Sequence, residues 1–102
     1  MEPSLPMAVP WYENESDYLA VVAMLPASER QDPLTYRAFR AKIEAFEKDL
    51  QNKGMVTRRI PIKAVTVKTW CDAHNKQVCR QSLTDYITAD LAFRLRDETR
   101  NN

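Results

Sequence analysis

One amphipathic stripe constrains the fold of this chain more than any other feature of its sequence. Between Asp32 and Gly54, apolar residues recur at alternating intervals of three and four positions, which places them on one face of an α-helix. Charged residues fill most of the other positions, so we expect the rest of the chain to pack on this face. The stripe consists of Tyr36, Phe39, Ile43, Phe46 and Leu50.

Both ends of this helix carry sequence signals. At the start, the carboxylate of Asp32 can accept free amide protons of the first turn, and Pro33 lacks an N–H that would find no partner there. At the end, Gly54 is the only glycine in the chain, and glycine commonly adopts the left-handed conformation that closes a helix. The sequence therefore predicts a central helix over residues 32–54.

Before this helix, the sequence predicts an arm and a shorter helix. Prolines at positions 3, 6 and 10 favour an extended or disordered arm over residues 1–10, with Val9–Tyr12 as a candidate short strand. Asn14 and Ser16 are both suitable caps for a helix over about residues 16–25, which Pro26 would end.

After Gly54 the hydrophobic pattern changes to a period of two, which predicts a strand over residues 56–62. Pro61 cannot donate a backbone hydrogen bond, so this strand is expected to be short or at an edge. An unpaired edge favours pairing with another strand, either the segment Val9–Tyr12 or the same strand of a second chain.

The helical period returns twice in the last third of the chain. It predicts one helix from about Ala64 to His74 and a second from about Ser82 to Asp97, followed by a frayed tail over residues 98–102. We therefore expect a single domain (1–102) of the mainly helical α+β class, with about four helices packed round the helix 32–54 and one or two short strands.

Composition argues against several classes of function. One glycine cannot supply a phosphate-binding loop or a dinucleotide fold, so we expect no such cofactor. No apolar run approaches the ~18 residues of a membrane span, and two cysteines form no disulfide framework. These observations favour a cytoplasmic protein without a membrane segment.

Cys71, His74 and Cys79 form the only metal-like cluster in the sequence. Structural zinc usually needs two pairs of ligands, and a catalytic Cys–His pair needs a third residue that orients it. Neither requirement is met in the sequence, so we expect no metal ligands, no catalytic residues and no enzymatic activity.

The net charge of +1 conceals an asymmetry. Residues 1–52 carry five basic and nine acidic residues, a net charge of −4, whereas residues 53–96 carry nine basic and three acidic residues, a net charge of +6. Such a division indicates either a surface that binds a polyanion or two halves that neutralise one another. The sequence leaves both interpretations open.

Two candidate surfaces follow. Residues 67–88 have the outline of a helix-turn-helix, whose second helix would present side chains to nucleic acid while other basic residues contact phosphates. The candidate nucleic-acid contacts are Arg58, Arg59, Lys63, Lys68, Arg80, Gln81 and Thr84. The aromatic amino-terminal cluster and the candidate edge strand are alternative surfaces for a protein partner or a second copy, with Trp11, Tyr12, Tyr18, Val56 and Ile60 as candidate contacts.

The pattern Trp-Tyr-x-x-x-x-Asp-Tyr at residues 11–18, the run Arg59-Ile-Pro-Ile and the pair Trp70-Cys71 resemble small uncharacterised bacterial proteins of mobile elements. This resemblance implies a bacterial, cytoplasmic setting and transfers no active residues. Our first expectation is a non-enzymatic, self-associating protein-interaction module. The alternative is a small nucleic-acid-binding regulator that uses residues 67–88.

Overall fold

The computed structural model describes residues 6–30 and 34–100. These residues form four α-helices, one short 3₁₀ helix and two strands, which confirms a mainly helical α+β fold. No helix in the described part of the chain is both long and apolar enough to cross a bilayer. In chain order the elements are β1 (Met7–Trp11), α1 (Glu15–Met24), η1 (Ala27–Glu29), α2 (Tyr36–Asn52), β2 (Thr57–Pro61), α3 (Ala64–Ala73) and α4 (Arg80–Arg100).

The two strands pair in parallel, with Met7 opposite Thr57 and Trp11 opposite Pro61. Backbone hydrogen bonds of 2.8 Å close both ends of the ladder, from Met7 N–H to the Val56 carbonyl and from Ile62 N–H to the Trp11 carbonyl. Parallel strands require a long crossover, which α1 and α2 supply. Of the two partners expected for strand 56–62, the structure contains the amino-terminal segment of the same chain.

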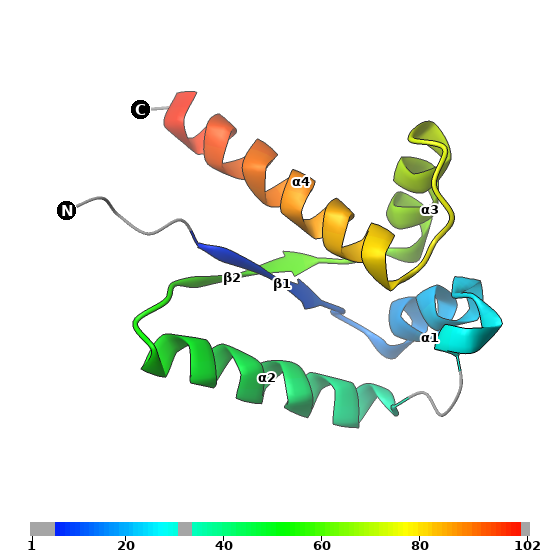
Figure 1. Cartoon of the computed structure of the whole chain (residues 1–102), viewed down its shortest axis with the longest axis horizontal. Helices are drawn as coiled ribbons and strands as arrows, with labels where there is room; N and C mark the ends of the chain where they lie inside the picture. The colour runs from blue at the N-terminus through cyan, green and yellow to red at the C-terminus, as the bar shows by residue number, and fades with distance from the viewer. Residues whose placement is uncertain (1–5, 31–33, 101–102) are drawn as a thin grey trace.

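The sheet separates α2 from α4, which lie on its opposite faces (Figure 1). Neighbouring side chains of a strand point to opposite faces, and Arg58 accordingly pairs with Glu98 of α4 while Arg59 pairs with Glu47 of α2. The sheet, and not the helix predicted over 32–54, therefore occupies the middle of the domain.

The core contains apolar side chains from both strands, α1, α3 and α4. Six residues are almost fully buried, and burial of each large aliphatic side chain contributes roughly 1.5–3 kcal/mol. Cys71 packs among them as a small apolar residue. The six are Val9, Val21, Ile60, Ile62, Val67 and Cys71.

Three predicted boundaries are wrong or incomplete. Helix α2 begins at Tyr36, because the Thr35 hydroxyl accepts the Ala38 N–H at 3.1 Å; Asp32 and Pro33 lie outside the described residues. Helix α4 extends to Arg100, so residues 98–100 are helical and not a frayed tail.

Within the predicted arm 1–10, residues 7–10 belong to β1, and residues 1–5 lie outside the described part of the chain. Of the two candidate caps of the first helix, the structure uses Asn14, whose Oδ1 accepts the Asp17 N–H at 2.9 Å, whereas Ser16 lies within α1.

The predicted stop at Gly54 is confirmed. Gly54 has a φ of 83° and donates its N–H to the Gln51 carbonyl at 3.0 Å, while Met55 N–H reaches the Leu50 carbonyl at 3.0 Å. These two bonds satisfy carbonyls at the end of α2 and turn the chain towards β2.

We expect Gly54→Ala to destabilise the domain by about 1 kcal/mol, because a Cβ atom disfavours the left-handed conformation. A Cβ atom at this position would meet no atom within 4 Å, so the cost is in the backbone alone. Urea unfolding followed by circular dichroism measures the difference. Gly54→Asn should cost less than Gly54→Ala, and equal stability of wild type and Gly54→Ala would contradict this account.

Candidate functional site

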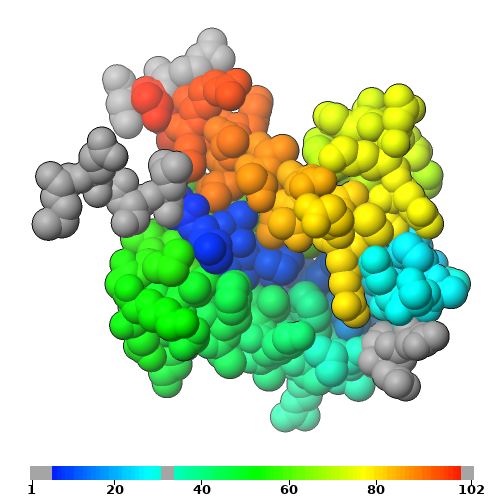
Figure 2. All heavy atoms as spheres, in the orientation of Figure 1, coloured from blue at the N-terminus to red at the C-terminus, as the bar shows by residue number. Residues whose placement is uncertain are grey.

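A groove with a volume of about 740 Å³ lies between α2 and α4. Figure 2 shows the hollow between these helices, with atoms of β1 at its bottom. Strand β1 contributes Met7, Ala8 and Pro10 to the lining, and α1 contributes Val21 and Val22 at one end. The remaining lining residues are Tyr12, Tyr18, Leu25, Glu29, Leu34, Phe39, Lys42, Phe46, Ile62, Arg80, Leu83, Thr84, Ile87 and Thr88.

The two walls are helical stripes. On α2 the lining positions are Phe39, Lys42 and Phe46, and on α4 they include Leu83 and Ile87. Phe46 was expected to pack in the core, but 43% of its surface is exposed at the groove. The apolar stripe of α2 is wider than the part of α2 that the sheet covers. Phe46 therefore leaves apolar surface exposed to solvent.

An aromatic cluster of Tyr12, Tyr18 and Phe39 forms part of the groove lining. The Tyr12 ring lies 5.3 Å from Tyr18 and 5.4 Å from Phe39, both edge to face. The Tyr36 hydroxyl donates to the Tyr12 carbonyl at 2.6 Å, and the Tyr18 hydroxyl donates to the Leu34 carbonyl at 2.5 Å. Burial raises the pKa of the Tyr12 hydroxyl well above its ordinary value.

Three charged residues line the groove. Glu29 accepts the backbone N–H of Arg80 at 2.7 Å, which places its carboxylate at the amino-terminal end of α4. Lys42 and the Arg80 side chain are exposed, and neither forms an ion pair with another described residue. The groove is therefore apolar with two cationic side chains at its walls.

Most predicted nucleic-acid contacts already have partners within the chain. Arg59 forms two hydrogen bonds with Glu47, at 2.8 and 2.9 Å, and Arg58 pairs with Glu98. These bonds raise the pKa of both arginines, and Arg58 lowers the pKa of Glu98. Because Arg58 and Arg59 lie on opposite faces of the sheet, they do not form one basic surface.

Two of the other five predicted nucleic-acid contacts also bind a carboxylate of the same chain. Lys68 pairs with Asp72 at 2.6 Å, and Gln81 donates to Asp85 at 3.1 Å. Hydrogen bonds from Lys76 and Gln81 lower the pKa of Asp85. The remaining three are Lys63, which precedes α3, and Arg80 and Thr84, which line the groove.

The predicted protein contacts fall into two sets. Tyr12, Tyr18 and Ile60 are buried in the core, so they offer little surface to a partner. Trp11 is half-buried, with the guanidinium groups of Arg59 and Arg40 at 3.7 and 4.7 Å from its ring. Val56 is 57% exposed beside β2.

The cysteines and the histidine lie apart from the groove lining. Cys71 is buried, while His74 is exposed and stacks on Trp70 with a ring separation of 4.2 Å. Hydrogen bonding with Ser82 lowers the pKa of the half-buried Cys79 thiol. In residues 6–30 and 34–100, no group of three or more His, Cys, Asp and Glu side chains is arranged to hold a metal ion.

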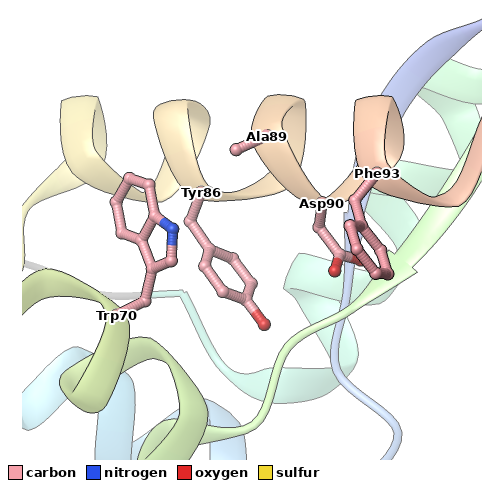
Figure 3. Close-up of a pocket in the computed structure, with 5 residues that line it drawn as sticks. All are labelled: Trp70, Tyr86, Ala89, Asp90 and Phe93. Atoms are coloured by element: carbon pink, nitrogen blue, oxygen red, sulfur yellow. The ribbon is translucent and has the colours of Figure 1, made fainter. Parts of the chain in front are cut away.

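A second, smaller hollow of about 300 Å³ lies between α3 and α4 (Figure 3). Its lining includes the rings of Trp70, Tyr86 and Phe93, with Trp70 and Tyr86 in an edge-to-face arrangement. The Asp90 carboxylate beside them accepts a hydrogen bond from Arg94 at 2.6 Å. Because a local guanidinium already compensates that carboxylate, this hollow is a weaker candidate for a binding site than the groove.

No protein-family model, curated protein or solved structure matches this chain. A function for this chain must therefore be inferred from the geometry of the groove between α2 and α4.

The Glu47–Arg59 contact should stabilise the side of the sheet that faces α2. Glu47 is 7% exposed, and its carboxylate binds a guanidinium that also covers Trp11. We expect Glu47→Gln to cost about 1–2 kcal/mol, at the low end for a charged hydrogen bond because Arg59 is half-exposed.

The matched control is Asp49→Asn on the same helix, because Asp49 forms an exposed ion pair with Lys53. This control should remain within about 0.5 kcal/mol of wild type. Urea unfolding of both variants measures the difference, and equal effects would show that the Glu47 contact is no stronger than a surface pair.

Proposed function

We propose that this chain is a non-enzymatic protein-interaction module that binds a segment of another protein in the groove between α2 and α4. The observation that carries the proposal is the groove itself, about 740 Å³ in volume and lined mainly by apolar side chains. Exposed apolar surface of this kind, with charged residues beside it, is typical of protein-binding sites.

The chemistry of the lining favours binding over catalysis. Among the described residues, the lining includes no cysteine, histidine, serine or aspartate, and its one carboxylate, Glu29, is bound to the backbone of α4. Nucleophilic and acid–base mechanisms use such groups in hydrogen-bonded pairs. A cytoplasmic setting is part of the proposal, because Cys71 and Cys79 are free thiols.

The distribution of exposed apolar side chains favours a partner other than a second copy. Among the described residues outside the groove, large exposed apolar side chains occur singly, on α1, before β2, on α3 and on α4. They are Leu19, Val56, Val65 and Phe93. None of these elements presents an exposed apolar stripe that a second copy of the groove would hold.

The nucleic-acid alternative has less support. Arg58, Arg59 and Lys68 each pair with a carboxylate, and Arg80 and Thr84 line the apolar groove. Nucleic-acid affinity depends on cations that are free to neutralise phosphates.

Filling the groove should abolish binding. We expect that peptides selected from a random display library on the wild-type protein will lose at least about tenfold in affinity for Thr84→Trp, because the indole would occupy the space between the walls. Fluorescence anisotropy with labelled selected peptides measures the loss.

The matched control is Thr69→Trp on α3. Both threonines are exposed and donate their hydroxyl to the carbonyl four residues earlier, Thr84 at 3.2 Å and Thr69 at 2.9 Å, but only Thr84 lines the groove. The control should bind the peptides like wild type. Selected peptides that bind Thr84→Trp and wild type equally would refute the groove as the binding site.

A further inference from the structure

The floor of the groove restricts the kind of segment that can bind there. In a parallel ladder, alternate residues direct both backbone groups to the partner strand, and Met7, Val9 and Trp11 of β1 do so towards β2. The carbonyl groups of Pro6, Ala8 and Pro10 therefore point away from β2, towards the outer edge. Since proline has no N–H, Ala8 is the only one of these three residues that provides a backbone donor.

An outer edge between two helical layers is the usual place for a further strand, but this edge is poorly suited to one. Strand addition derives its affinity from alternating donors and acceptors along the edge. Pro6 and Pro10 remove two of three donors, which is a common protection of edge strands against pairing. A segment that binds here without loss must satisfy its own backbone hydrogen bonds, as an α-helix does.

The walls have the shape that a helix requires. Phe39, Lys42 and Phe46 follow a helical spacing on α2, and Leu83 and Ile87 do so on α4, so both walls are ridged along their length. An amphipathic helix places apolar side chains between such ridges at intervals of three and four residues.

The charges of the walls specify the flanks of that helix. Lys42 on α2 and Arg80 at the start of α4 are exposed and form no ion pair within the described residues, and Glu29 is bound to the α4 backbone. Carboxylates on either side of an apolar stripe would face these two cations, whereas lysines at the same positions would be repelled.

We propose that the occupant of the groove is an amphipathic α-helix of a protein partner, with an apolar stripe flanked by glutamate or aspartate. This inference rests on the proposed function, because it assumes that the groove binds a protein segment. It adds the conformation and the charge of that segment.

Three synthetic peptides of about 18 residues test the inference, a length at which helices form in water when the sequence favours them. The first has leucine at helical spacing and glutamate on the flanks. The second has the same composition with leucine and glutamate alternating, as in a strand, and the third replaces glutamate with lysine. Anisotropy titrations against the full chain, Thr84→Trp and Thr69→Trp measure binding.

The acidic helical peptide should bind at least about tenfold more tightly than the other two, and Thr84→Trp should remove that binding. The double variant Lys42→Glu/Arg80→Glu should reverse the preference between the acidic and the basic helical peptides. Circular dichroism establishes that each variant is folded.

Two outcomes would overturn the inference in different ways. If the alternating peptide binds as tightly as the helical one and Thr84→Trp removes both, the groove is a binding site but its occupant is a strand. If neither the designed nor the library-selected peptides respond to Thr84→Trp, the proposed function fails as well.

Discussion

The parallel pairing of β1 with β2 is the interaction on which the rest of the structure depends. It joins Met7–Trp11 to Thr57–Pro61 across the whole α1–α2 crossover, and each face of the resulting sheet buries an apolar side chain, Val9 on one and Ile60 on the other. Helices α2 and α4 cover opposite faces, so the sheet holds them apart. A sheet of two strands is only about 10 Å wide, about the diameter of one helix, and the space beyond its edge becomes the groove.

Helix α2 and its carboxyl-terminal end could be predicted from the sequence because both depend on residues that are close together in the chain. The stripe from Tyr36 to Leu50 identified α2, and Gly54 identified its end, since few residues other than glycine adopt a φ of 83°. The start was wrong because Thr35 and Asp32 are both good helix caps, and sequence alone does not rank two such candidates. Helix boundaries are determined by tertiary contacts as well as by caps.

The groove was not predictable, because it is assembled from segments that are distant in the sequence. Phe46 belongs to the same stripe as Ile43 and Leu50, yet it is exposed while they are buried. The difference arises because the sheet covers only part of that stripe, and the extent of the sheet depends on a long-range pairing. Thr84, predicted to contact nucleic acid, lies on the α4 wall of the groove, and the position of this wall likewise depends on contacts between segments that are distant in the sequence.

Ion pairs engage six of the nine basic residues in the segment 53–96. Three of these pairs use the carboxylates of the segment itself and leave its net charge unchanged: Lys68–Asp72, Lys76–Asp85 and Arg94–Asp90. The other three compensate it from outside the segment: Lys53–Asp49, Arg59–Glu47 and Arg58–Glu98. Pairing of this kind removes most basic side chains from long-range attraction of polyanions. Lys42 and Arg80 form no ion pair with another described residue, so their charges act at short range on a segment bound between α2 and α4. In a partly desolvated groove such charges select among partners more than they add affinity, because a partner of the wrong sign leaves them buried without compensation. The prolines along β1 also act by disfavouring one kind of partner, because they lack the N–H donors that an added strand would need. Conformation and charge together therefore restrict which segments can bind between the apolar walls.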